Sequence, residues 1–499
     1  MKKYFLIIAI FMLPVIYEAM RSGDMVYSGM TYPTDGNTYM SFVNQARDGN
    51  FLFTNMYTSE YVPRIMFRPT YLFTGILSFV MPDIIAYHLM RILGIVLLVF
   101  FLDRLYRLLL PRKLVKWTIF FAIAGSGFGY IWYMLTGKVS SPDIWLAETN
   151  MTAMLLSHPH NILSIAFMCG AAYYFLQWFH DNKLVDITKS SILLSLLGFE
   201  HLFDVITLCS AFGILVLEEA LRKKRIRWEL GIMGALVALP LIYTFVVFTA
   251  FPEFAAWDSQ NNLTTPRIYH VFLGYGLLFF SFAMFLKSFW NKKLKSGVKL
   301  MLYWTIATFV LIYAPLNIQR RFLEGLTIPL AVFTSICLFT LLPKIVKDKR
   351  LYLAGTVTFI LLLLPTSIYH YQNSFSLGND ERKTEIYFVP KYLYHGEIEA
   401  FRFLQTTKSD SVILSTYNIG NYIPRYANRY SYLGHWAQTI SFDSKQDDVR
   451  MFYRNKKELS GIDYIWYGVD ERKLYPKFVP PQNTEKVFDN ILVQVYKAG

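Results

Sequence analysis

Residues 70–81 read TYLFTGILSFVM, an apolar stretch that decides how the chain crosses a membrane. A spanning helix needs about 20 apolar residues, so this stretch is too short to cross a bilayer. If it did cross, the basic segment DRLYRLLLPRKLVK at residues 103–116 would lie outside, against the cytoplasmic bias of lysine and arginine. We therefore expect residues 70–81 to form a short, half-buried helix on the external side.

Long apolar runs on both sides of this stretch are typical of membrane helices. The 499-residue chain is 54% hydrophobic, and its runs fit a mainly α, polytopic membrane protein with about 11 spans. No small-residue cleavage site follows the first run, so we expect it to be a retained helix. The runs lie at residues 4–20, 84–102, 117–135, 161–179, 190–219 (two spans around a polar break), 229–250, 269–286, 299–314, 326–342 and 351–368.

The distribution of charge orients these spans. The net charge is +14, and nearly half of the 49 lysines and arginines lie at the N-terminus and in five loops on one side. This is the cytoplasmic bias of membrane proteins, so the charge does not indicate nucleic-acid binding. It places the N-terminus in the cytoplasm and residues 369–499 outside. Ionisable residues within the spans, which transporters use, are scarce apart from Arg91, and this disfavours a transporter.

Two domains are expected. Residues 1–368 form the transmembrane domain with a long first external loop, residues 21–83. Residues 369–499 form an extracytoplasmic α/β domain, because GEIEAFRFLQ has helical spacing and SVILST, IDYIWYG and ILVQVYK have the composition of strands. The polar segment at residues 369–395 is expected to be a tether between the two domains.

The first external loop contains the acids Asp35 and Asp48. Asp35 lies in TDGNTYM, just ahead of a helical pattern. A carboxylate at this place can accept a proton from an incoming hydroxyl group. It can equally cap the helix that follows by accepting free backbone N–H groups. The residues alone leave both interpretations open.

Histidines and acids also gather in two other external segments. His158 and His160 in SHPHN could donate hydrogen bonds to phosphate, bind metal or cap a helix. Residues two apart do not share a helix face, so a zinc pair is only weakly indicated. In GFEHLFD, His201 and Asp204 accompany Glu200 at the tip of a hydrophobic hairpin. An ordinary turn would use Gly, Asn or Pro there, so a functional role and a structural one are equally supported.

A pair of arginines precedes a later span. Arg320 and Arg321 lie in NIQRRFLEGL, with Glu324 in the same short external loop. Guanidinium groups match phosphate oxygens in a bidentate manner. The alternative is that they anchor the helix at lipid headgroups. Because external arginines run against the cytoplasmic bias, we favour phosphate binding.

This layout resembles the GT-C superfamily of membrane glycosyltransferases, which use polyprenyl-phosphate-linked sugars. In that superfamily an Asp of the first external loop is the catalytic acid/base or a metal ligand, and Asp35 takes that place, followed by the aromatic Tyr39. Familiar branches carry two adjacent acids, whereas Gly36 follows Asp35 here. That departure favours a metal-free base over a divalent cation. QRRFLEGLTIPL and GNYIPRYANRYSYLGHWAQT are similar to a group of predicted bacterial membrane proteins of the superfamily.

The resemblance implies an inverting glycosyltransferase of the bacterial plasma membrane, in contact with membrane lipid. It would transfer a sugar from a polyprenyl-phosphate-linked donor to an envelope glycan, lipid or protein on the outer face, with Asp35 as base. The alternative is a non-catalytic envelope protein that binds a lipid-linked glycan or a partner through its external domain. The expected substrate-binding residues are Arg320, Arg321, Glu324, His158, His160, His201, Asp204, Tyr39 and Asp48.

Overall fold

The computed structural model describes residues 2–66, 68–224, 227–290, 292–375 and 389–499. The chain folds into two compact units. The helical unit consists of Met1–Phe11, Met90–Val246 and Asn262–Ser374. The mixed unit consists of Met12–Leu89, Val247–Asn261 and Phe375–Gly499.

Among the described residues, six helical segments are long and apolar enough to cross a membrane. A seventh crossing results if α5 (Arg112–Ala124) and α6 (Gly129–Thr136), which meet at 40°, form one broken span. The mainly helical, multi-pass fold is confirmed, but the number of about 11 spans is not. The six segments are α4 (Asp83–Leu109), α9 (Pro159–Asp181), α12 (Leu230–Ala250), α14 (Ile268–Phe289), Gln319–Ile345 and Lys349–Ser374.

Four of the expected spans fold as helices that are not among these crossings, namely α1 (Lys2–Arg21), α10 (Leu184–Glu200), α11 (Leu202–Lys223) and α15 (Ser296–Leu311). Helices α10 and α15 have 17 and 16 residues, against the roughly 20 that a bilayer core requires. Helix α11 is long enough, but it carries Asp204 in its first turn and Glu218 and Glu219 near its end. The count of about 11 spans therefore stays a prediction.

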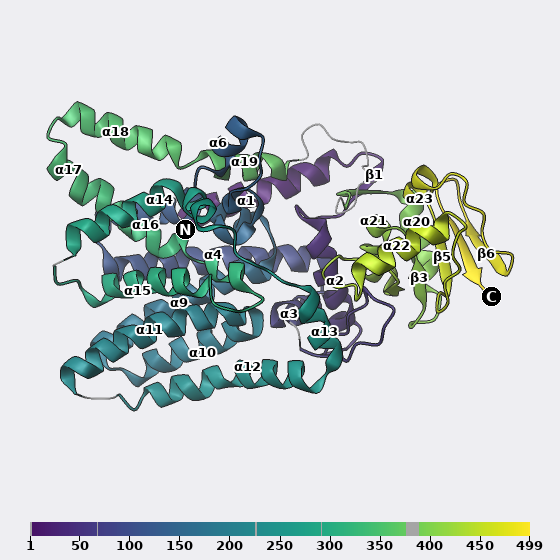
Figure 1. The fold of residues 1–499 in the computed structure, drawn as a ribbon, viewed down its shortest axis with the longest axis horizontal. Coiled ribbons are helices and arrows are strands. Elements are labelled where there is room, and N and C mark those ends of the chain that lie inside the picture. Colours follow the sequence, from purple (N-terminus) through teal and green to yellow (C-terminus); the bar gives the residue numbers. More distant parts are fainter. Residues whose placement is uncertain (1, 67, 225–226, 291, 376–388) are drawn as a thin grey trace. The chain divides into compact units, whose positions relative to one another are not determined.

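The long helices pack into a bundle. Helix α9 packs along α10 and α11 along α15, while α5 and α14 both contact α16 (Thr327–Ile336) (Figure 1). Phe175 of α9 stacks on Phe212 of α11 with 3.9 Å between ring centroids, and Trp178 and Trp304 are fully buried. This aromatic packing holds the C-terminal part of α9 against α11.

Short elements complete this part of the chain. They are α7 (Pro142–Trp145), η1 (Ala147–Thr149), α8 (Met151–Leu156), η2 (Gln319–Leu323), η3 (Cys337–Leu341), α17 (Leu342–Ile345), α18 (Lys349–Leu362) and α19 (Pro365–Ser374). Helix α1 (Lys2–Arg21) covers the first expected span and contains Pro14. Helix α13 (Pro252–Gln260) follows α12.

The stretch at residues 70–81 folds as the short helix that its length predicts. Helix α3 (Pro69–Leu77) has nine residues, of which Thr70, Tyr71, Thr74 and Gly75 are buried. Gly75 packs against α2 (Pro33–Arg47), where a Cβ atom would lie 2.3 Å from the Cβ of Ala46. The expected half-buried helix is therefore present, and its external location stays a prediction.

The mixed unit contains two sheets. Strand β1 (Met25–Tyr27) pairs antiparallel with β2 (Tyr392–Tyr394), which joins the first loop to the tail. The second sheet has the order β4-β3-β5-β7-β6, in which β4, β3 and β5 are parallel and the remaining pairs are antiparallel. Its strands are β3 (Val412–Leu414), β4 (Tyr430–Ser431), β5 (Tyr464–Tyr467), β6 (Thr484–Asp489) and β7 (Gln494–Ala498).

The predicted strands SVILST, IDYIWYG and ILVQVYK correspond to β3, β5 and β7, and GEIEAFRFLQ corresponds to α20 (His395–Gln405). Apolar residues between Val389 and Val495, including the fully buried Trp466, form one core. The other helices of this region are α21 (Tyr417–Gly420), η4 (Ile423–Ala427), α22 (Phe442–Tyr453) and α23 (Val469–Leu474). The boundary at residue 369 stays a prediction, and residues 376–388 of the expected tether lie outside the described residues.

Candidate functional site

A one-residue break between α10 and α11 places two polar side chains in the core of the helical unit. Helix α10 ends at Glu200, α11 begins at Leu202, and His201 between them has non-helical dihedral angles of φ −143° and ψ 89°. Asp204 lies in the first turn of α11, where the positive end of the helix dipole favours a carboxylate. The predicted polar break at residues 200–204 is thus confined to His201.

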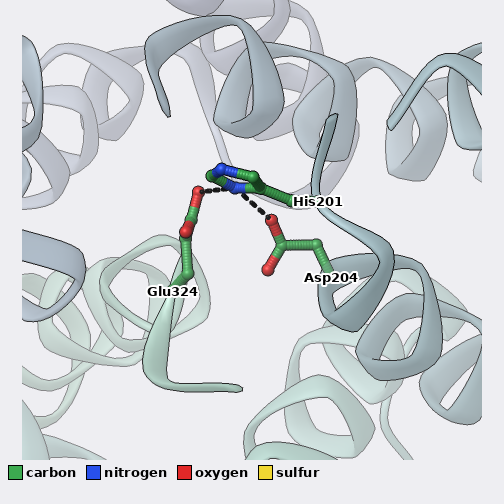
Figure 2. A group of neighbouring side chains, drawn as sticks. All are labelled: His201, Asp204 and Glu324. Atoms are coloured by element: carbon green, nitrogen blue, oxygen red, sulfur yellow. Dashed lines mark hydrogen bonds and ion pairs between the residues drawn. The ribbon is translucent and has the colours of Figure 1, made fainter. Parts of the chain in front are cut away.

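Glu324 reaches the same place from a distant segment. It ends η2 and precedes Gly325, whose φ of 74° turns the chain toward α16. Its Oε1 atom lies 3.0 Å from Nδ1 of His201, and Oδ2 of Asp204 lies 3.4 Å from the same nitrogen. Figure 2 shows the imidazole ring held between the two carboxylates. All three side chains are buried, with 1%, 0% and 0% of the surface of His201, Asp204 and Glu324 exposed.

The two histidines of SHPHN extend this group. His158 is the N-cap residue of α9 and His160 lies in its first turn, so the pair is not confined to one helix face. The His160 ring meets the His201 ring edge-on with 5.2 Å between centroids, and His158 stacks on His160 at 6.0 Å. Five of the predicted substrate-binding residues therefore lie together. We call His158, His160, His201, Asp204 and Glu324 the buried polar cluster.

The paired arginines have different surroundings. Arg321 forms an ion pair with Glu148 of η1, and the guanidinium of Arg320 lies over the ring of Trp145 at 5.4 Å from its centroid. Sequence analysis did not identify Glu148 as a partner. The only signal for it is an acid in the segment between the expected spans at residues 117–135 and 161–179. Because Arg321 is held by a carboxylate, the two arginines are not equivalent phosphate ligands, and their substrate-binding role stays a prediction.

In the mixed unit, Asp35 is not the residue that caps its helix. The N-cap of α2 is Tyr32, whose side chain makes no capping hydrogen bond, and Asp35 lies in the first turn. The carboxylate benefits there from the helix dipole. It is also 52% exposed, so solutes can reach it. The prediction that Asp35 is the N-cap residue is therefore wrong, because α2 begins two residues earlier, at Pro33.

Asp35 has a histidine partner from the tail. Nε2 of His435 lies 2.7 Å from Oδ1 of Asp35, and Nδ1 of His435 accepts a hydrogen bond of 3.2 Å from the backbone N–H of Ala437. An imidazole nitrogen that accepts carries no proton, so in the neutral ring Nε2 carries the proton and donates it to Asp35. The histidine is 4% exposed and its orientation is fixed from both sides. We call these two residues the Asp35–His435 pair.

Contacts between the first loop and the tail hold this pair. Thr439 donates a hydrogen bond of 2.7 Å to the carbonyl oxygen of Tyr57 and accepts one of 3.1 Å from the N–H of Gly434. Arg425 is buried and donates to Oδ1 of Asn37 at 2.9 Å and to the carbonyl of Ser28 at 2.7 Å. Asn37 lies two residues after Asp35 in α2. The hydrogen bond from Arg425 to Asn37 therefore holds the start of this helix.

Sequence analysis missed His435 and Arg425 as site residues. Both lie in GNYIPRYANRYSYLGHWAQT, which is similar to a group within the superfamily, but nothing in the sequence assigned a partner to either. Two of the predicted substrate-binding residues lie in the mixed unit and contact other side chains of that unit. Tyr39 stacks on Tyr71 at 4.6 Å, and Asp48 accepts a hydrogen bond of 2.8 Å from Asn428. Their role in substrate binding stays a prediction.

The chain is similar to known proteins in its three-dimensional structure. No protein-family model and no curated protein matches the chain. ArnT from Cupriavidus metallidurans bound to undecaprenyl phosphate is similar over 99% of this chain and 98% of its own, with a TM-score of 0.54 and 10% identity. Its apo structure gives 0.52 and 11%, over 99% and 97%. An oligosaccharyltransferase from Archaeoglobus fulgidus gives 0.47 and 13%, over 94% and 69%.

Proposed function

We infer from the GT-C fold, which this chain adopts, that the protein is a membrane glycosyltransferase. The proposed reaction moves a sugar from a polyprenyl-phosphate-linked donor to an acceptor hydroxyl in the bacterial envelope, on the outer face of the plasma membrane. Undecaprenyl phosphate in the similar ArnT structure supports a lipid-linked donor. The fold alone does not distinguish an enzyme from a binding protein, so the argument for catalysis depends on the residues.

The Asp35–His435 pair carries the proposal. General base catalysis needs a carboxylate that the substrate can reach and that neighbouring groups hold in one orientation. Asp35 is half exposed, and the Nε2–H of His435 fixes one of its oxygens at 2.7 Å. The histidine cannot serve as the base itself, because it is buried and its Nδ1 already accepts from Ala437. This division of roles resembles other sites in which one group reacts and a second orients it.

In the proposed reaction Asp35 removes the proton of the acceptor hydroxyl as that oxygen attacks the anomeric carbon of the donor sugar. The new carbon–oxygen bond forms while the bond between that carbon and the phosphate oxygen breaks. Its electron pair leaves with the polyprenyl phosphate. One displacement inverts the configuration of the sugar, and Asp35 finally releases the proton to solvent.

A phosphate group bound by the helical unit would require positive charge there. Arg320 is the better candidate for this role, because Arg321 is already paired with Glu148. The ring of Trp145 beneath Arg320 still leaves the edge of the guanidinium able to donate hydrogen bonds. We therefore propose Arg320 as the principal phosphate ligand of the helical unit.

The test compares Asp35→Asn with Asp24→Asn, a control that changes an exposed acid of the same loop with no proposed role. Purified protein or membranes would be supplied with labelled polyprenyl-phosphate sugars, and envelope glycans of cells with and without the protein would be compared by mass spectrometry to find the product. We expect Asp35→Asn to lower the turnover rate by about 10²–10⁴ while donor binding persists. Full activity of Asp35→Asn would contradict the proposal.

A second candidate, a non-catalytic protein that binds an envelope glycan, is supported by a pocket in the tail. The pocket has a volume of 430 Å³ and is lined by Tyr417, Asn418, Arg450, Asp470 and Tyr475, among others. Thr416 and Asp470 follow the parallel strands β3 and β5, and ligands of α/β sheets bind at such carboxyl ends. This candidate predicts glycan binding that is unchanged in Asp35→Asn and no transfer of labelled sugar.

A further inference from the structure

Two carboxyl groups and one imidazole ring lie at the centre of the buried polar cluster. Asp204 and Glu324 contribute two carboxyl groups, and His201 contributes at most one positive charge, so the three ionised groups sum to −1 or −2. All three are buried. Buried charges are costly unless an opposite charge accompanies them, and in proteins that charge is a side chain or a metal ion. A divalent cation bound to the two carboxylates and the neutral imidazole would bring this sum to zero.

The two carboxylates converge on one nitrogen atom. Oε1 of Glu324 and Oδ2 of Asp204 lie 3.0 Å and 3.4 Å from the same Nδ1 of His201 (Figure 2). A single N–H group donates a well-directed hydrogen bond to one acceptor. Two acceptors at one nitrogen are therefore a poor arrangement for a proton. They are a good arrangement for a cation that takes the place of that proton.

The separations also suit metal coordination. A ligand atom from each residue lies within 4.8 Å of the other two. A cation at roughly 2.0–2.2 Å from nitrogen and carboxylate oxygen requires ligand atoms about 3–4 Å apart. The present distances allow such bonds with small side-chain rotations. A mixed set of one imidazole and two carboxylates favours Mn²⁺ or Zn²⁺ over Mg²⁺ or Ca²⁺, which prefer oxygen ligands only.

The backbone brings these three groups together by interrupting helices at two places. His201 occupies the break between α10 and α11, which sets Asp204 one turn further along, and Glu324 occupies the turn between η2 and α16. The φ of 74° at Gly325 permits that turn. Two separate departures from regular helix thus deliver ligands to one point. An ordinary connection between helices uses Gly, Asn or Pro and requires no acid in either place.

We propose that His201, Asp204 and Glu324 bind one divalent cation of the Mn²⁺ or Zn²⁺ type through Nδ1, Oδ2 and Oε1. Three protein ligands leave at least one coordination position for water or for another oxygen. The proposal concerns the helical unit alone and does not depend on the transferase activity. It also differs from a metal on Asp35, which the glycine at position 36 disfavours.

The test is direct binding to the full-length protein, purified in detergent and treated with a chelator. Mn²⁺ would be titrated while the electron paramagnetic resonance signal of the free ion is followed, and Zn²⁺ would be titrated in competition with a chromogenic chelator. We expect one ion per chain. Because the cation takes the place of a proton on Nδ1, binding should release protons and weaken as the pH falls.

The variants His201→Gln, Asp204→Asn and Glu324→Gln keep the side-chain size and remove one ligand each, and each should weaken binding by about tenfold or more. The matched control is His370→Gln. His370 is a buried histidine of the same unit, and its Nε2 bonds the carbonyl oxygen of Asp143 at 2.7 Å. It should bind the ion as the parent does. Equal losses in the control and in the three variants would overturn the assignment.

One measurement requires no variant and so does not depend on how well the variants fold. Pulsed electron paramagnetic resonance of bound Mn²⁺ should show magnetic coupling to a single imidazole nitrogen. Absence of that coupling, or no binding of Mn²⁺ and Zn²⁺ at millimolar concentration, would also overturn the proposal.

Discussion

His435 donates a 2.7 Å hydrogen bond from Nε2 to Oδ1 of Asp35, across 400 positions of the sequence. The bond connects the first turn of α2 with a loop that follows β4, and both belong to the mixed unit. The tail is thus part of the surroundings of the candidate base. If the proposed function is right, changes in the tail should alter the chemistry without altering the base.

His435→Gln should lower kcat by about tenfold, because it removes the group that orients the Asp35 carboxylate but leaves that carboxylate in place. KM for the donor should change little. The measurement is steady-state kinetics with a labelled donor. The control, His395→Gln, replaces an exposed histidine at the start of α20 and should leave kcat unchanged. A His435→Gln enzyme with parental kcat would contradict the orienting role.

Arg320 and Arg321 should respond differently to lysine. Arg320→Lys keeps the charge but loses the bidentate geometry, so it should weaken use of the lipid donor. An anchoring residue would tolerate lysine, which also reaches lipid headgroups. Arg321→Ala should instead lower the free energy of unfolding by about 1–3 kcal/mol, because it leaves the largely buried Glu148 without its ion-pair partner.

The double variant Arg321→Ala/Glu148→Ala checks this interpretation. Removing both partners should restore part of the lost stability, as measured by thermal unfolding in detergent. Additive losses would mean that the two residues do not interact.

Sequence analysis predicted the elements of this fold better than their contacts. Helix α3, the break at His201 and strands β3, β5 and β7 follow from local patterns of apolar and polar residues, and the structure contains each of them. The number of spans is not confirmed, because expected spans such as α10 and α11 fold as short or charged helices that length and composition alone do not identify as crossings. Fold class was therefore accessible from the sequence, whereas the exact count of crossings was not.

The candidate site shows the same division. His201, Asp204 and Glu324 were each identified because charged residues interrupt apolar runs there, but their meeting joins segments 123 positions apart. The partners of Asp35 and Arg321 were missed because pairing depends on how the chain packs. One histidine in a tyrosine-rich loop and one acid in a short loop carry no signal of their own. The sequence therefore predicted which residues belong to the candidate sites better than it predicted which of them lie close together.

Membrane topology can be tested with single cysteines at exposed positions. Tyr61→Cys, Gln260→Cys and Glu485→Cys should react with an impermeant thiol reagent in intact cells, because these positions are expected outside. Arg112→Cys and Lys293→Cys should react only after the membrane is opened. Cys169 and Cys337 are buried and Cys209 is half-buried, so the parent chain is labelled in parallel as the background. Labelling at position 112 from outside would mean that residues 70–81 do cross the membrane.

Residues 389–499 should fold when they are expressed alone. Their apolar residues form a core of their own, with Trp466, Phe401 and Ile413 almost fully buried. The fragment should give a cooperative thermal transition by circular dichroism. A spectrum without regular structure would mean that contacts with residues 12–89, such as the β1–β2 pairing, are required for folding.

The stability of that fragment should depend on pH through Glu471. Burial, and next the nearby charge of Asp470, raise the pKa of Glu471 to about 7, even though its carboxylate accepts hydrogen bonds from the N–H and hydroxyl groups of Thr416. In the unfolded chain the pKa is about 4.3. The folded state therefore keeps a proton that the unfolded state has lost throughout the range between these two values.

The contribution of Glu471 to the free energy of unfolding is therefore highest below about pH 4. It falls by about 3 kcal/mol as the pH rises to about 7. Glu471→Gln cannot ionise, so it should remove this slope while its amide oxygen still accepts from Thr416. Glu485→Gln, which changes an exposed acid of β6, should keep the slope. The measurement is urea unfolding of the three proteins at several pH values between 4 and 8. A parental protein that becomes more stable across this range would contradict the raised pKa of Glu471. A Glu471→Gln variant with an unchanged slope would mean that other groups cause the slope.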